Sequence, residues 1–138
     1  MDPHSPELTE IFRQELEERS RRLVEGARAL SERSVDPASI PDLVRDAHTI
    51  KGSAGMLDYP AIAAAAARLE KVWRRVAEGQ LPDPEVVVAM EATAGRLLAT
   101  MDNEDPELAG LVDRLDASLA SEGSPAQPSE LLPVKEPE

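Results

Sequence analysis

The chain has 138 residues, of which 15 are lysine or arginine and 27 are aspartate or glutamate, and its formal net charge is −12. This length suits one domain and is short for two. The acidic charge argues against binding to nucleic acid or to an anionic membrane, because both need a basic surface. The sequence contains no cysteine, which excludes disulfides, thiol nucleophiles and thiolate-bound metals.

The hydrophobic residues favour helices. They make up 41% of the chain, but only 2% of the residues are aromatic and alanine dominates the remainder. This composition predicts an all-α fold in which helices pack on helices. No apolar run approaches the roughly 20 residues of a membrane span, and residues 1–10 lack the pattern of a signal peptide. We therefore expect a soluble cytoplasmic domain.

Apolar residues at helical spacing predict five helices in chain order. The first opens with Ser5 as N-cap and Pro6 in the first turn. The Asp–Pro pairs that start at Asp83 and Asp105 repeat this signal before the last two helices, and Gly79 is a natural end for the third. The predicted helices cover about residues 6–33, 60–78, 84–102 and 106–120, with the second helix starting near residues 39 to 41 and ending near 56.

The connections between these helices are short, about 3 to 8 residues, so neighbouring helices should run antiparallel. The expected architecture is an up-and-down four-helix bundle with an additional fifth C-terminal helix. From Ser121 the composition shifts to Ser, Pro, Gln and Glu, which cannot bury enough apolar surface to fold. We therefore expect one domain over residues 1–120 and a flexible tail over residues 121–138, either a linker to further domains or a free end.

Most kinds of catalytic or cofactor site can be excluded by the residues that they need. The two histidines, His4 and His48, are too few for a multi-histidine metal site. Neither follows a glutamate by three residues, as a di-iron bundle site requires. The sequence has no G-x-x-x-x-G-K-S/T loop, so the domain should neither bind nor hydrolyse ATP by itself. We expect no cofactor or metal bound by this domain.

The chemistry that remains centres on His48 in the second predicted helix. His48 lies about 100° round the helix from the core residue Ala47, at the boundary of the apolar face. Gly52 and Gly55 lie within the same helix, although each costs up to about 1 kcal/mol relative to alanine. Because helical side chains lean toward the N-terminus, glycine at position 52 leaves the imidazole uncovered.

Lys51 lies one helical turn from His48 on the same side. Only three of the fifteen basic residues are lysine, so its position is notable. An ammonium group there would stabilise negative charge that arrives at the imidazole. An isolated H-x-x-K pair is more often an incidental surface feature, and the functional interpretation therefore depends on the whole string around it.

That string, AHTIKGSAGML over Ala47 to Leu57, resembles the signature of histidine phosphotransfer (HPt) domains. It is most similar to the N-terminal phosphotransfer domain of chemotaxis-type histidine kinases of the CheA class. The resemblance covers about residues 6–102 and includes the acidic first helix, the third helix and the Gly79-Gln80-Leu81 turn. The family resemblance implies an HPt-like helical bundle that carries a phosphoryl group.

The resemblance assigns roles to four residues. His48 would be the phosphorylated nucleophile, and Glu70 would be the acid on the next helix that hydrogen-bonds the imidazole. A carboxylate on one ring nitrogen fixes the tautomer and raises the basicity of the other nitrogen. Lys51 and Gly52 match the residues that receive the phosphoryl group electrostatically and clear space for it. Without the resemblance, Glu70 would be interpreted as an ordinary exposed glutamate.

Two positions depart from the family pattern. Many relatives have glycine where this chain has Asp58, and here we expect the acid to cap the third helix. Chemotaxis-type relatives often have a second histidine where this chain has Ala67, so any role of that histidine in proton transfer is missing. Neither departure removes the nucleophile.

The function implied by the resemblance is that of a phosphocarrier, not an enzyme, in a two-component phosphorelay. His48 would accept a phosphoryl group from the ATP-binding domain of a histidine kinase and donate it to an aspartate of a response-regulator receiver domain. ATP and Mg²⁺ would be bound by those partner domains. The chain would be a standalone carrier or the phospho-accepting part of a larger kinase. We expect a monomeric isolated domain and a transient interface centred on Gly52, with local positive charge from Arg45, Lys51 and Arg74.

Two other functions remain open for the same residues. One is a degenerate HPt-like bundle that docks partners without accepting phosphate. The other is an enzyme with its own activity, such as a phosphohistidine phosphatase built on a bundle. Phosphorylation of His48 would exclude the first, and turnover of ATP by the isolated chain would favour the second.

Overall fold

The computed structural model describes residues 5–120, and within this range it contains helices and no strand. Each of the five α-helices ends within about two residues of its predicted limits, which confirms the all-α prediction. A 3-10 turn, η1, precedes the second α-helix. The elements are α1 (Pro6–Ser31), η1 (Pro37–Ser39), α2 (Ile40–Met56), α3 (Pro60–Ala77), α4 (Pro84–Thr100) and α5 (Pro106–Ala120).

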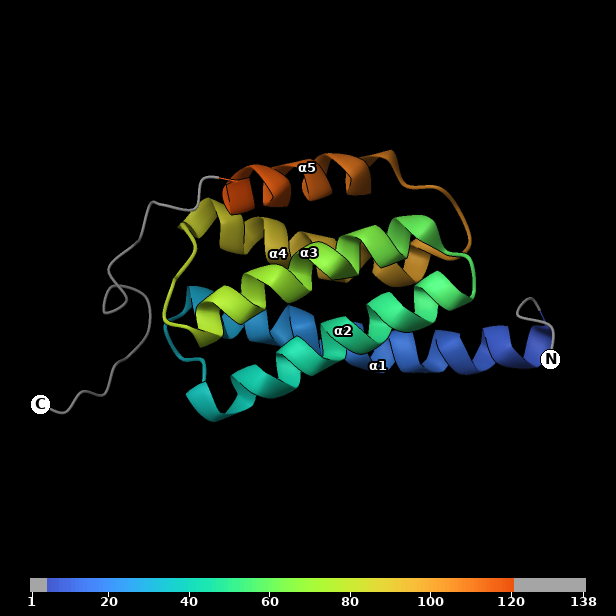
Figure 1. The fold of residues 1–138 in the computed structure, drawn as a ribbon, viewed down its shortest axis with the longest axis horizontal. Helices are drawn as coiled ribbons and strands as arrows, with labels where there is room; N and C mark the ends of the chain where they lie inside the picture. The colour runs from blue at the N-terminus through green and yellow to red at the C-terminus, as the bar shows by residue number, and fades with distance from the viewer. Residues whose placement is uncertain (1–4, 121–138) are drawn as a thin grey trace, which may run out of the picture.

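The first four helices form the predicted up-and-down bundle, as Figure 1 shows. Helix α2 packs against α3, and α1 packs against both α4 and α2. Helix α5 lies on the outside of the bundle against α3 and α4 (Figure 1). None of the helices in the described part of the chain is long and apolar enough to cross a membrane. The tail expected over residues 121–138 lies outside the described residues, as does His4.

The helix starts follow from proline and from capping side chains. Each α-helix has a proline in its first turn, where the missing N–H has no partner to lose. The Ser5 hydroxyl accepts a hydrogen bond from the Leu8 N–H at 3.2 Å, which confirms the predicted N-cap of α1. Asp105 accepts from the Glu107 N–H at 3.0 Å at the start of α5. Asp83 is the N-cap residue of α4, but its side chain accepts no capping hydrogen bond.

The expectation that Asp58 caps α3 is wrong. The N-cap residue of α3 is Tyr59, and its side chain makes no capping hydrogen bond. Asp58 instead follows Leu57, the C-cap residue of α2, and has a left-handed backbone conformation with φ of 71°. Glycine is the residue that this conformation favours after a helix. The glycine of relatives at this position therefore has a conformational explanation.

Gly26 allows α1 to approach α2 and α3 closely. A Cβ atom on Gly26 would lie 2.7 Å from Cδ1 of Leu43 and 3.3 Å from Cζ2 of Trp73. Trp73 is fully buried, so its ring has little room to move. Gly26 therefore leaves room for Leu43 and Trp73 at the point where three helices meet.

Replacing Gly26 with alanine is expected to lower the free energy of unfolding by about 1 to 3 kcal/mol, because Leu43 and Trp73 must move to admit the methyl group. Urea denaturation followed by circular dichroism measures this change. Gly95→Ala is the matched control, since its Cβ would make an ordinary contact of 3.9 Å with Val24. That variant should gain up to about 1 kcal/mol. Equal effects of the two substitutions would contradict the packing role of Gly26.

Asp46 joins α2 to α1 two residues before His48. Its side chain is 5% exposed. Arg22 donates to both carboxylate oxygens, from Nε and Nη2, at 2.9 Å each. Arg19 donates from Nη1 to Oδ1, also at 2.9 Å. A buried carboxylate is stable only when it is paired in this way, so these bonds fix the turn of α2 that carries the histidine.

Asp46→Ala is expected to lower the free energy of unfolding by about 2 to 3 kcal/mol, because it removes charge-assisted hydrogen bonds to two arginines. The control is Glu18→Ala, which removes the 61% exposed partner of the same Arg22. An exposed pair of this kind contributes about 0.5 kcal/mol or less. Chemical denaturation of both variants tests the contrast, and a loss of equal size for Glu18→Ala would argue against a special role for Asp46.

Candidate functional site

His48 and Glu70 face each other from the two packed helices α2 and α3. Nδ1 of the imidazole lies 3.0 Å from Oε2 of Glu70. The His48 side chain is 59% exposed, whereas the Glu70 side chain is only 5% exposed. The structure therefore brings together the predicted nucleophile and the predicted assisting acid, with the ring at the surface and the carboxylate beneath it. Glu70 is not the ordinary exposed glutamate that its position alone would suggest.

This contact determines the tautomer of His48. An ionised carboxylate can only accept hydrogen bonds, so Nδ1 of the neutral ring carries the proton and donates it to Glu70. The lone pair is then on Nε2, for which residues 5–120 provide no hydrogen-bond partner. The ring thus presents a free nucleophilic nitrogen to the solvent.

Glu70 also binds two positively charged side chains. Nζ of Lys51 lies 2.8 Å from Oε1. Arg74 donates from Nε to Oε2 at 3.0 Å, and its Nη2 contacts the same oxygen. Burial alone would raise the pKa of Glu70, but the hydrogen bonds from Lys51, Arg74 and His48 outweigh burial and lower this pKa to about 2. The carboxylate is therefore ionised at neutral pH.

The local positive charge is smaller than the sequence suggested. Arg45 pairs with Asp42 at 2.8 Å, and both side chains are 68% exposed. Lys51 and Arg74 share the carboxylate of Glu70, so these three side chains together keep one net positive charge beside the imidazole. Lys51, predicted to meet an incoming phosphoryl group, is bound to Glu70 in this structure.

The two glycines after His48 have no packing role within the domain. A Cβ atom on Gly52 or on Gly55 would meet nothing within 4 Å, and both residues are exposed. Each glycine nevertheless weakens the helix by up to about 1 kcal/mol relative to alanine. His48, Gly52 and the 74% exposed Met56 follow one another at four-residue spacing along the surface of α2. The open space above Gly52 is thus a feature that the fold itself does not need.

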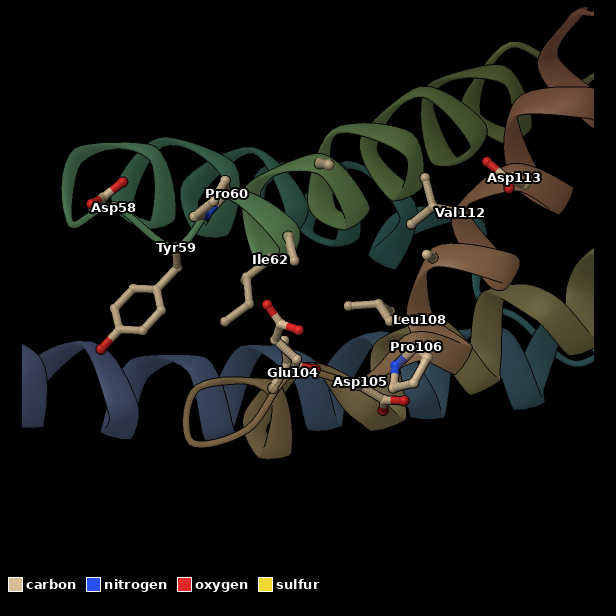
Figure 2. A pocket seen from close by; sticks show the side chains of 14 residues that line it. Asp58, Tyr59, Pro60, Ile62, Glu104, Asp105, Pro106, Leu108, Val112 and Asp113 are labelled. Atoms are coloured by element: carbon tan, nitrogen blue, oxygen red, sulfur yellow. The ribbon is translucent and has the colours of Figure 1, made fainter.

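A pocket of about 520 Å³ lies elsewhere in the molecule, between the start of α3 and α5. Figure 2 shows Ile62 of α3 and Leu108 and Val112 of α5 among its apolar lining. Neither His48 nor Glu70 lines this pocket. Within residues 5–120, no group of three or more histidine and acidic side chains is arranged to hold a metal ion. The candidate site is an exposed face of the α2–α3 pair, which suits contact with a macromolecule.

Sequence reasoning missed the role of two residues. Arg74 was expected only to add positive charge, but it binds the carboxylate that orients His48. Its position four residues after Glu70 on one helix is the signal that indicates such a pair. Asp46 gave no comparable signal, because its arginine partners lie more than twenty residues away on α1.

Comparison with known families agrees with this geometry. A family model of the Hpt domain matches residues 7–121, which include nearly all of the five helices. No curated protein and no solved structure matches the chain significantly. The match covers most of the 138 residues and contains the cluster around His48. The chain therefore belongs to the Hpt domain family, whose members are phosphocarriers of two-component signalling.

Proposed function

We propose that His48 accepts a phosphoryl group on Nε2 from a histidine kinase and donates it to an aspartate of a response-regulator receiver domain. The observation that carries this proposal is the contrast between the two ring nitrogens. Nδ1 is held by the buried carboxylate of Glu70, whereas Nε2 is free on a side chain that is 59% exposed. Membership of the Hpt family also supports a role in phosphotransfer.

In the first transfer, the lone pair of Nε2 attacks the γ-phosphorus of ATP held by the kinase domain. The N–P bond forms while the P–O bond to ADP breaks, and ADP leaves with the electron pair. The ring becomes positively charged, and Glu70 stabilises this charge through the proton on Nδ1. ATP and Mg²⁺ belong to the kinase domain in this proposal.

In the second transfer, a carboxylate oxygen of the receiver aspartate attacks the phosphorus. The P–N bond breaks, and its electron pair returns to Nε2. The proton on Nδ1 stays on the hydrogen bond to Glu70 in both steps, so the carrier needs no other proton donor or acceptor. This property suits a site in which Ala67 replaces the second histidine of chemotaxis-type relatives.

Lys51 is placed to assist without disturbing this hydrogen bond. Its ammonium group binds Oε1 of Glu70, whereas His48 uses Oε2. We propose that Lys51 turns from Glu70 to the phosphoryl oxygens when these arrive, because a phosphoryl group carries more negative charge than one carboxylate. The bond between His48 and Glu70 remains in place during that exchange.

The partner surface in this proposal is centred on Gly52. A carrier that serves a kinase and a receiver in turn needs a modest, transient interface. The resemblance of residues 47–57 to CheA-class kinases further supports a place as the phospho-accepting domain of such a kinase. A bundle that only docks partners is the alternative, and labelling with a histidine kinase and ATP separates the two.

Incubation of the full chain with a histidine kinase and ATP labelled at the γ-phosphate is expected to give acid-labile label on the wild type and none on His48→Gln. The variant keeps the size and polarity of the side chain but lacks the nucleophilic nitrogen. His4→Gln is the control and should accept label normally. A wild-type chain that binds receivers but stays unlabelled with several kinases would favour the docking function. ATP turnover by the chain alone would favour an enzyme.

Gly52→Ala is expected to stabilise the fold and to impair transfer. The new methyl group has no clash within the domain, so the free energy of unfolding should rise by up to about 1 kcal/mol. The methyl group would occupy the space that a partner needs next to His48, and transfer should slow by about tenfold or more.

Gly110→Ala on α5 is the matched control, because its Cβ also meets nothing within 4 Å and it lies away from the candidate site. It should stabilise the fold to a similar extent and transfer at the wild-type rate. Denaturation curves and single-turnover labelling measure the two properties. Wild-type transfer by Gly52→Ala would remove Gly52 from the proposed interface.

A further inference from the structure

Three donor groups crowd one oxygen of Glu70. Oε2 accepts from Nδ1 of His48 at 3.0 Å and from Nε of Arg74 at 3.0 Å, and it also contacts Nη2 of Arg74. Among residues 5–120, the other oxygen, Oε1, binds only Lys51. A carboxylate oxygen has two lone pairs, so the donors on Oε2 compete with one another.

From this crowding we propose that Arg74 is a positioning residue that competes with His48 for Oε2 and thereby weakens the hydrogen bond from Nδ1. The inference rests on the proposed carrier function and deepens it. Arg74 lies one turn after Glu70 on α3, and its side chain is 57% exposed, so it can bind or release the carboxylate without disturbing the core. Its place in the last turn of α3 also suits a cation at a helix C-terminus, but its guanidinium group contacts Glu70.

Competition by Arg74 would shorten the lifetime of phosphorylated His48. When phosphohistidine reacts with water, the oxygen of water attacks phosphorus, the P–N bond breaks and the ring leaves with the electron pair on Nε2. The two protons of the water stay on the product, dihydrogen phosphate. The ring is a good leaving group while Nδ1 keeps its proton. A stronger acceptor on Nδ1 draws that proton away and makes the ring a poorer leaving group. Because Arg74 binds the same oxygen of Glu70, it makes Glu70 a weaker acceptor for the Nδ1 proton. The ring therefore stays a good leaving group, and the phosphoryl group is easily transferred.

The charged residues on α2, and on the two helices that pack against it, come from three elements. Helix α2 contributes cations near the ring, and α3 contributes the carboxylate and its guanidinium partner. Helix α1 packs against α2, where its arginines bind Asp46. These groups include Arg45, Asp46 and Lys51 on α2, Glu70 and Arg74 on α3, and Arg19 and Arg22 on α1.

The test uses Arg74→Met, which keeps a flexible aliphatic stem and removes the donors. In the unphosphorylated chain, NMR should show the Nδ1 proton of His48 shifted downfield, because its hydrogen bond to Glu70 is stronger. The signal is assigned by its absence in His48→Gln. This measurement needs no kinase and no phosphoryl group, so it remains informative if the proposed carrier function fails.

The second measurement is the lifetime of phosphohistidine after chemical phosphorylation of the full chain with phosphoramidate, which transfers its phosphoryl group and releases ammonia. Arg74→Met should lengthen this lifetime about 2- to 10-fold, the range expected for one competing hydrogen bond. Arg74→Lys, which keeps the charge but has one donor nitrogen in place of three, should give an intermediate value.

Arg45→Met is the matched control. It removes an equal charge one turn from His48, but Arg45 binds Asp42 and not Glu70. It should leave the Nδ1 proton signal and the phosphohistidine lifetime near those of the wild type. Equal effects of both variants would mean that Arg74 acts only through its charge and not through its bond to Glu70.

An unchanged Nδ1 proton signal in Arg74→Met would overturn the proposed competition between Arg74 and His48. A shortened lifetime would overturn it as well, since it would mean that Arg74 holds the phosphoryl group directly. Failure of phosphoramidate to label His48 at all would count against the carrier function, and the NMR result would then decide the competition alone.

Discussion

The buried carboxylate of Glu70 organises the functional face of this domain. Burial by itself disfavours the ionised form of an acid, so this group keeps its charge only because Lys51, Arg74 and His48 surround it with donors. The same contacts hold the imidazole in one tautomer. Asp46 performs a parallel function on the other side of α2, where it is bound by arginines of α1. The helix that carries His48 is thus fixed by charge on both sides, before any partner arrives.

The sequence predicted the helices well because their limits depend on local chemistry. Prolines in first turns, Ser5 as a cap and Gly79 at a helix end all act within a few residues. The error at Asp58 has a different origin. An aspartate two residues before a proline favours a helix start, but here the tight link between α2 and α3 places Asp58 in a left-handed conformation. That conformation is decided by how two helices pack, which spacing alone does not encode.

The sequence predicts those residues of the candidate site that belong to one short motif. His48, Lys51 and Gly52 lie within one stretch of helix, and Glu70 followed from the resemblance of that stretch to a family. The crowding of Arg74 on the same oxygen as His48 depends on side-chain conformations across two helices, so no sequence pattern reveals it. The glycines illustrate the same limit. Gly26 and Gly52 both lie within helices, yet only Gly26 is closely surrounded by core side chains, and that difference is visible only in the structure.

The exposure of His48 has a consequence for the order of events in a relay. More than half of this side chain is open to solvent, and it does not line the pocket between α3 and α5. A reactive atom on an open face can be approached by any partner that brings its own catalytic groups, but by one partner at a time. If His48 carries the phosphoryl group as proposed, kinase and receiver exclude each other. The flow of phosphoryl groups through such a carrier is then set by competition for a single shared surface, and an excess of either partner would slow the step that depends on the other.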